Sequence, residues 1–117
     1  SYGGMFVNLR VHGFMPGTTY VNASEKSFHL TDTATMVMCA STGRCLIYLP
    51  ATTRDGQTVF LEQLGTGSMR LYASGGQKLR TGATEASYID ASAGYTIIAV
   101  FIKGFGAEAW CINKIKL

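Results

Sequence analysis

The feature that most constrains the fold is the alternation of short apolar segments with turns rich in glycine. Segments such as Ala34–Cys39, Cys45–Leu49 and Tyr95–Lys103 have the length of β-strands and are bounded by turn residues. Short strands with turn signals every eight to twelve residues or so are typical of sandwiches and barrels. The pattern therefore predicts an all-β chain: a small antiparallel β-sandwich, jelly-roll-like, with little or no helix.

Composition excludes several other classes. The chain has 117 residues, which suits one domain, and 14 of them are Gly while only 2 are Pro. Apolar residues make up 47%, which excludes intrinsic disorder. The basic residues behind the net charge of +3 are scattered, whereas a nucleic-acid surface needs them clustered. The longest apolar stretches, such as Ile97–Ile102, are far below the roughly 18 residues of a membrane span. We therefore expect neither nucleic-acid binding nor membrane insertion.

The periodicity predicts about nine strands. These are Met5–Val11, Lys26–Leu30, Ala34–Cys39, Cys45–Leu49, Gln57–Gln63, Ser68–Ala73, Gln77–Arg80, Tyr95–Lys103 and Ala107–Leu117. The last segment also fits a short helix, but the tight Gly turn before it favours a strand. Phe14–Thr19 is expected to be a turn or linker. Thr81–Gly94 is expected to be mostly loop, with Tyr88-Ile89 as an anchor.

Glycine-containing turns are expected to close hairpins. Gly65-Thr66-Gly67 and Gly75-Gly76 each separate two predicted strands. Cys39 and Cys45 would face each other across a third hairpin, where a disulfide is conceivable. The favoured interpretation is that both are reduced thiols packed in the core, because buried free cysteines usually act as small hydrophobic side chains.

Several predicted strands carry apolar side chains on both faces. Gln57–Gln63 is the clearest case and is expected to be buried on both sides. One small core cannot hold every such side chain, and monomers seldom expose a contiguous apolar face of several hundred Å². A homo-oligomer is therefore expected, with contacts from Ala34–Leu49 or Tyr95–Lys103.

About three-quarters of the chain, from Phe28 to Leu117, resembles a β module found at the carboxyl-terminal ends of bacteriophage tail-fibre and related virion appendage proteins. The pattern is a Thr/Asp start, an apolar strand ending in Leu-Pro, a Gly restart, a Gly-rich turn and a final Trp. Its elements here are Leu30-Thr31-Asp32, Thr35-Met36-Val37-Met38, Ser41-Thr42-Gly43, Leu46–Ala51, Gly56–Leu61, Ala73-Ser74-Gly75-Gly76 and Trp110-Cys111-Ile112. The chain departs from the pattern at Gly104–Glu108, where the module usually carries Asp-Gly.

The resemblance implies a virion protein: a homotrimeric, non-enzymatic fibre tip that meets the bacterial surface. Residues 1–27 would then form an N-terminal strand and a neck to an upstream fibre region, and residues 28–117 the β-sandwich tip domain. The expected partners are two further copies of the chain and a bacterial surface receptor, with a glycan expected over a protein. The alternative is a purely structural trimerisation or capsid-decoration domain without a ligand.

Sugar binding needs aromatic rings beside short polar side chains, since C–H faces stack on rings while hydroxyls need fixed partners. Two segments expected to be loops contain this mixture. The candidate receptor-binding residues are Tyr72, Ser74, Gln77, Glu85, Ser87, Tyr88 and Asp90. The competing interpretation is that Tyr72 and Tyr88 only close the ends of the sandwich, and Trp110 is expected in the core.

Chemistry-bearing residues are sparse. The sequence has no nucleophile elbow, phosphate-binding loop or metal-ligand spacing. Carboxylates for glycoside hydrolysis would have to come from distant positions such as Asp55 and Asp90. We therefore expect no enzymatic activity, no cofactor and no metal site; a polysaccharide depolymerase fragment is the remaining enzymatic alternative.

Overall fold

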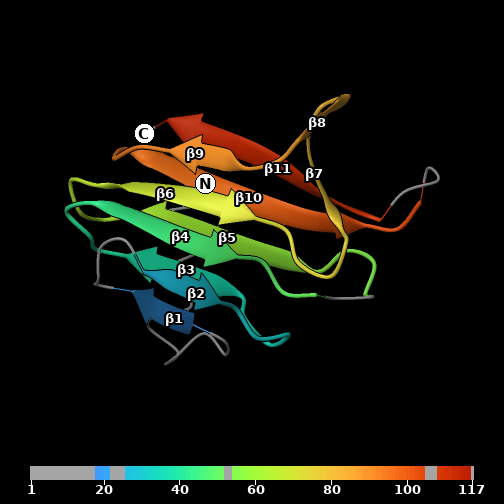
Figure 1. Ribbon diagram of the computed structural model, residues 1–117, viewed down its shortest axis with the longest axis horizontal. Coiled ribbons are helices and arrows are strands. Elements are labelled where there is room, and N and C mark those ends of the chain that lie inside the picture. Colours follow the sequence, from blue (N-terminus) through green and yellow to red (C-terminus); the bar gives the residue numbers. More distant parts are fainter. Residues whose placement is uncertain (1–17, 22–25, 52–53, 105–107, 117) are drawn as a thin grey trace, which may run out of the picture.

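The computed structural model describes residues 18–21, 26–51, 54–104 and 108–116, which fold into two β-sheets packed face to face (Figure 1). This described part holds strands and no helix, so the predicted all-β sandwich class is confirmed. The strands are β1 (Thr18–Val21), β2 (Ser27–His29), β3 (Met36–Cys39), β4 (Arg44–Tyr48), β5 (Thr58–Gln63), β6 (Ser68–Tyr72), β7 (Lys78–Thr81), β8 (Thr84–Ala86), β9 (Ile89–Ala91), β10 (Tyr95–Ile102) and β11 (Ala109–Lys116).

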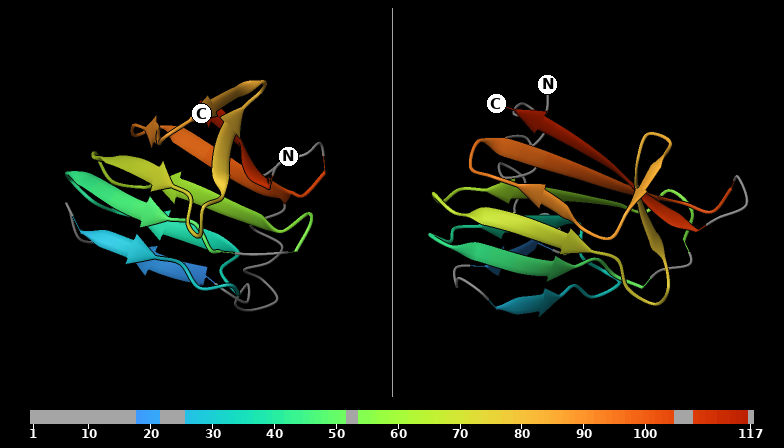
Figure 2. Two further views of the ribbon diagram at one scale, coloured as in Figure 1. Left: turned by 45° about the vertical axis from the view of Figure 1, so that its right-hand side comes forward. Right: turned by 45° about the horizontal axis from the view of Figure 1, so that its top comes forward.

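The two sheets differ in size. The seven-stranded sheet has the order β1-β3-β5-β10-β11-β7-β8, and the four-stranded sheet has the order β2-β4-β6-β9. From β1 to β6 the chain changes sheet at every strand, and within each sheet these strands pair in parallel. The chain from β1 to β6 therefore winds like a β-solenoid. Each turn, or coil, contributes one strand to each sheet and stacks on the next, as the views in Figure 2 show.

This connectivity corrects the antiparallel, jelly-roll-like expectation. Antiparallel pairing is found at β5–β10, β10–β11, β6–β9 and β7–β8, while in the part of the chain that the structure describes β1 to β6 pair with one another only in parallel. The turn at 40–43, the Gly65–Gly67 turn and the Gly75-Gly76 turn join strands of opposite sheets and are arches, not hairpins. A short glycine turn has the same local sequence in both roles, so only the long-range pairing distinguishes them.

The pairs β3–β5 and β4–β6 share one register offset. Met36 pairs with Phe60 in one sheet and Arg44 with Ser68 in the other, so both offsets are 24 residues. The arch at 64–67 consequently lies directly on the arch at 40–43. Gly67 N–H donates to the Ser41 carbonyl at 2.9 Å.

The core fills the space between the sheets with inward-facing side chains of both. Its largest fully buried members are Trp110, Phe101, Ile47, Leu49, Leu61, Met69, Leu71, Leu79, Ile97, Val21, Val37 and Val59. Trp110 packs on Phe101 with a ring-centroid distance of 5.4 Å. The prediction that Trp110 belongs to the core is confirmed, and β11 is a strand as expected.

The outer face of the seven-stranded sheet is apolar but less exposed than the sequence suggests. Met36, Met38 and Ile98 are only 7%, 5% and 8% exposed in the single chain. Phe60 and Glu62 of β5 are half-buried, so the expectation that this strand is buried on both sides is only partly correct. The excess of apolar side chains therefore does not by itself demand a partner subunit.

Two segments expected to be irregular contain strands. Thr81–Gly94 holds β8 and β9, and the predicted linker Phe14–Thr19 reaches into β1, which pairs with β3. Their small polar residues carry little strand propensity, and cross-strand pairing overrides it. The described part of the expected neck thus belongs to the same two sheets. The predicted strand Met5–Val11 lies outside the described residues.

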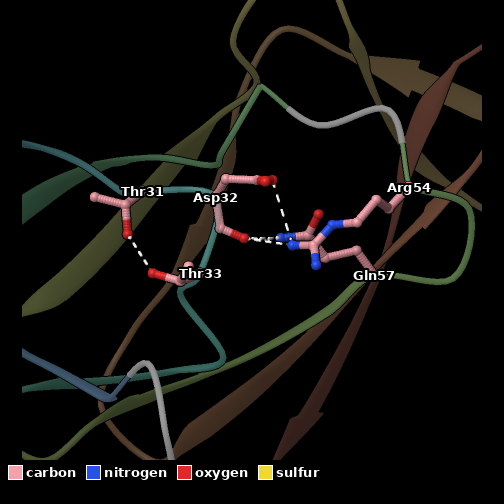
Figure 3. A network of polar contacts seen from close by, with 5 residues as sticks. All are labelled: Thr31, Asp32, Thr33, Arg54 and Gln57. Atoms are coloured by element: carbon pink, nitrogen blue, oxygen red, sulfur yellow. Dashed lines mark hydrogen bonds and ion pairs between the residues drawn. The ribbon is translucent and has the colours of Figure 1, made fainter.

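A network of polar contacts links the β2–β3 and β4–β5 connections, at the end of the sheets opposite the two arches (Figure 3). Arg54 and Gln57 both donate to the Asp32 carbonyl, and Arg54 also pairs with the Asp32 carboxylate at 3.3 Å. Thr31 and Thr33 hydroxyls lie 3.0 Å apart beside it. These contacts join the β2–β3 turn to the β4–β5 loop, so we assign the network to the fold and not to a binding site.

Candidate ligand-binding surface

The residues expected to contact a receptor fall into two neighbouring groups. Tyr72 and Asp90 lie on the outer face of the four-stranded sheet, because Met69, Leu71, Ile89 and Ala91 beside them are buried. Tyr88 precedes β9 and is exposed. The second group of expected residues, Gln77, Glu85 and Ser87, lines a pocket next to this face. Ser74 lies in the β6–β7 connection, where its carbonyl accepts a hydrogen bond from Gln77 N–H.

A row of stacked rings crosses the four-stranded sheet. His29 and Tyr48 stack at 4.4 Å between centroids, and Tyr48 and Tyr72 at 4.9 Å. In-register parallel strands place these residues side by side, since His29 pairs with Tyr48 and Tyr48 with Tyr72. The stacking covers both ring faces of Tyr48 and one of Tyr72. Tyr72 therefore stabilises the stack of coils from the outer face of the sheet and does not close an end of the sandwich as the competing interpretation expects.

Tyr88 continues the row in a different geometry. Its ring is tilted by 53° to that of Tyr72 at a centroid distance of 6.3 Å, and the residue is 45% exposed. The guanidinium carbon of Arg70 lies 4.0 Å from the Tyr88 ring centroid, within the range of a cation–π contact. Tyr88 is thus held in place from one side and remains accessible to a ligand.

Arg70 and Asp90 form a bidentate ion pair beside the Tyr88 ring. Arg70 Nε donates to Asp90 Oδ1 at 2.7 Å, and its terminal nitrogen to Oδ2 at 3.0 Å. Hydrogen bonding to Arg70 lowers the pKa of Asp90, and the charges of Arg44 and Lys114 act in the same direction. The same hydrogen bond raises the pKa of Arg70. Lys114 Nζ also donates to the Asp90 carbonyl at 3.0 Å, at the edge strand β9.

This pair predicts a pH-dependent contribution to stability. Because the folded-state pKa of Asp90 is lowered, its contribution is present above the unfolded carboxyl value of about 3.9 and is lost as the pH falls through the folded value. Asp90→Asn should therefore lower the urea midpoint by no more than a few tenths of a molar at pH 7, as suits a half-exposed pair. Urea titrations should show that the difference in urea midpoint between the parent and Asp90→Asn disappears below pH ~3.9. A difference that does not change with pH contradicts this prediction.

The pocket beside Tyr88 has a volume of about 400 Å³ and is lined by Ala73, Gln77, Lys78, Leu79, Glu85, Ala86 and Ser87. Lys78 and Glu85 bring opposite charges to it from the two strands of the β7–β8 hairpin. Gln77 is positioned by Trp110, whose Nε1 donates to Gln77 Oε1 at 3.3 Å. Ala73 and Ser87 of the lining directly precede or follow residues of the ring row in the chain, so the pocket lies close to Tyr88 without including its ring.

We refer to Arg70, Tyr88 and Asp90 together with this pocket as the Tyr88 surface. Of the expected residues, it includes Tyr88, Asp90, Gln77, Glu85 and Ser87, whereas Tyr72 contributes to the stacked row. Sequence reasoning missed Arg70, Lys78 and Lys114. Arg70 could have been found from its spacing, because it stands two residues before Tyr72 and so shares a strand face with it.

Metal-binding clusters and membrane-spanning helices are both absent from the residues that the structure describes. These residues contain no cluster of three or more His, Cys, Asp or Glu side chains able to hold a metal ion. Within the same ranges, no helix is long and apolar enough to cross a membrane. The chain matches no known protein-family model, and no curated protein is detectably similar to it.

Proposed function

We propose that the chain is the tip domain of a bacteriophage fibre or related virion appendage, which assembles as a homotrimer and attaches the virion to a glycan on the bacterial surface. Its role is binding without catalysis. The proposal is supported by the sequence resemblance described above and by the all-β sandwich.

The observation that carries the proposal is the Tyr88 surface. An exposed aromatic ring contacts a fixed guanidinium–carboxylate pair, and a pocket of about 400 Å³ with polar walls begins at Ser87, the residue before Tyr88. Sugars are bound by this combination, since their C–H faces pack on rings while their hydroxyls need donors and acceptors in fixed places. The β7–β8 hairpin and the β6–β7 connection form the walls, and such segments tolerate the variation that host recognition requires.

Replacing both Tyr88 and Asp90 by alanine should weaken attachment to host cells about tenfold or more, because aromatic anchors supply much of the energy of an interface. The melting temperature should fall by no more than a few degrees, since Tyr88 is exposed and the Arg70–Asp90 pair lies at the surface. Flow cytometry with a fluorescently labelled domain on a panel of bacterial strains measures the attachment.

A matched control for this experiment is Leu64→Ala, which removes an exposed apolar side chain from the β5–β6 arch. It should leave attachment unchanged. If the double variant binds like the parent, the Tyr88 surface is not the receptor site; if it unfolds, these two residues are structural.

Assembly is expected through the outer face of the seven-stranded sheet. Half-buried Phe60, Val100 and Ile102 and exposed Tyr20, at 72%, leave apolar surface on this face for a second copy to cover. Sedimentation velocity at micromolar concentration should give the mass of a trimer, and a monomer there contradicts the proposed assembly. Substitutions at Met38 or Ile98 are poor tests, because both residues are already buried within one chain and an aspartate there would unfold it.

The alternative function is a structural virion module without a ligand. The stacked row of His29, Tyr48 and Tyr72 favours it, because those rings are used to stabilise the coils and present few open faces. The two functions differ in one observable: a structural module forms the trimer and binds no cell or glycan, whereas a receptor-binding tip does both.

A further inference from the structure

Two cysteine sulfurs lie against each other between the sheets. Cys39 ends β3 in the seven-stranded sheet, and Cys45 is the second residue of β4 in the four-stranded sheet. Both residues are fully buried, and their Sγ atoms are 2.9 Å apart. Non-bonded heavy atoms reach optimal contact only at roughly 3.5 Å or beyond, so the two side chains are closer than packed thiols need to be.

We propose that Cys39 and Cys45 form a disulfide that joins the two sheets across the β3–β4 arch. The arch itself is already held in shape: Ser41 Oγ donates to the Gly43 carbonyl at 2.7 Å, and Gln63 Nε2 donates to Ser41 Oγ at 3.1 Å. Gln63 Nε2 also contacts Cys39 Sγ at 3.4 Å, which fixes that sulfur beside its partner. A disulfide bond of about 2.05 Å would shorten the distance between the two sulfurs by about 0.9 Å. This inference is independent of the proposed function.

The third cysteine cannot compete for either partner. Cys111 lies in β11 opposite Val100, whose side chain faces the outside of the seven-stranded sheet. It is half-buried there, on the far side of the sheet from the core that holds Cys39 and Cys45. The geometry therefore predicts one linkage and one remaining thiol.

The oxidation balances with a small-molecule disulfide, such as oxidised glutathione, as the oxidant. A thiolate of one cysteine attacks the oxidant, forming a mixed disulfide and releasing one reduced thiol; the second cysteine then displaces the other. Two protons and two electrons leave the Cys39–Cys45 pair, and two reduced small thiols are formed. Burial raises the pKa of Cys45 to about 11 in the folded chain, so little of the reactive thiolate is present there. The disulfide is therefore expected to form during folding, before the core closes over the two thiols.

The test is refolding of the full chain from the reduced, denatured state in a buffer of reduced and oxidised glutathione. Remaining thiols are then blocked with iodoacetamide, and the protein is digested with trypsin. Cleavage after Arg44 separates the two cysteines, so the disulfide appears in mass spectrometry as peptide Ser27–Arg44 linked to peptide Cys45–Arg54. Cys111 should carry the blocking group. Alkylation of all three cysteines, or any linkage through Cys111, overturns the proposal.

A stability measurement gives an independent readout. The oxidised protein should melt about 5–10 °C higher than the reduced one, as suits a short closed loop in a chain of this size. Cys111→Ser should keep this difference, and Cys45→Ala should abolish it. Equal melting temperatures for the oxidised and reduced parent contradict a stabilising cross-link, whatever the variants do.

Discussion

Replacing Gly67 by alanine should lower the free energy of unfolding by about 3 kcal/mol or more. A Cβ atom on Gly67 would lie 2.0 Å from the carbonyl oxygen of Gly43 in the arch below, and that oxygen belongs to the backbone and cannot rotate away. The two arches would have to separate, which would weaken the hydrogen bonds that Gly67 N–H and Ser68 N–H donate to the lower arch. Chemical denaturation followed by circular dichroism measures the loss.

Gly104→Ala is the matched control, because nothing lies within 4 Å of a Cβ built at that position. It should change stability by less than about 0.5 kcal/mol. Equal effects of the two substitutions would mean that the arches do not stack as described.

Replacing Trp110 by alanine should destabilise the chain by about 3–5 kcal/mol. The side chain is fully buried, packs on Phe101 and fills the space between β11 and the other sheet. Alanine would leave a cavity there and would leave Gln77 Oε1 without the hydrogen bond from the indole. Thermal unfolding followed by near-ultraviolet circular dichroism measures the loss.

Trp110→Phe separates the two contributions. It retains most of the apolar volume and removes only the indole N–H, so its effect should be well below that of alanine. If both variants were equally destabilised, the hydrogen bond to Gln77 and not the packing would account for the role of Trp110.

Much of the fold could be predicted from local patterns. Alternation placed Val59 and Leu61 on one face of a strand, and both are buried. Parallel stacking was missed because a glycine arch and a glycine hairpin have the same local sequence. The long-range signal is nevertheless present: Thr42-Gly43 recurs as Thr66-Gly67 and Tyr48 as Tyr72, each at the 24-residue offset of the β3–β5 and β4–β6 pairs.

The candidate site was predicted only in part, for a related reason. Composition alone points to Tyr88 and Asp90, within a segment expected to be a loop. Their main partner, Arg70, comes from another strand, and the register that pairs Arg70 with Asp90 is set by the packing of β9 against β6. No local pattern contains that register, so neither the ion pair nor the cation–π contact could be inferred beforehand.

A glycan array measures whether the Tyr88 surface binds a glycan. The fluorescently labelled parent domain, Tyr88→Ala and Leu64→Ala should be applied at equal concentration to the same array of bacterial surface polysaccharides and oligosaccharides. The parent and Leu64→Ala should bind the same subset of glycans, and Tyr88→Ala should lose most of that signal. Absence of binding by a correctly folded parent, or equal binding by Tyr88→Ala, would contradict it.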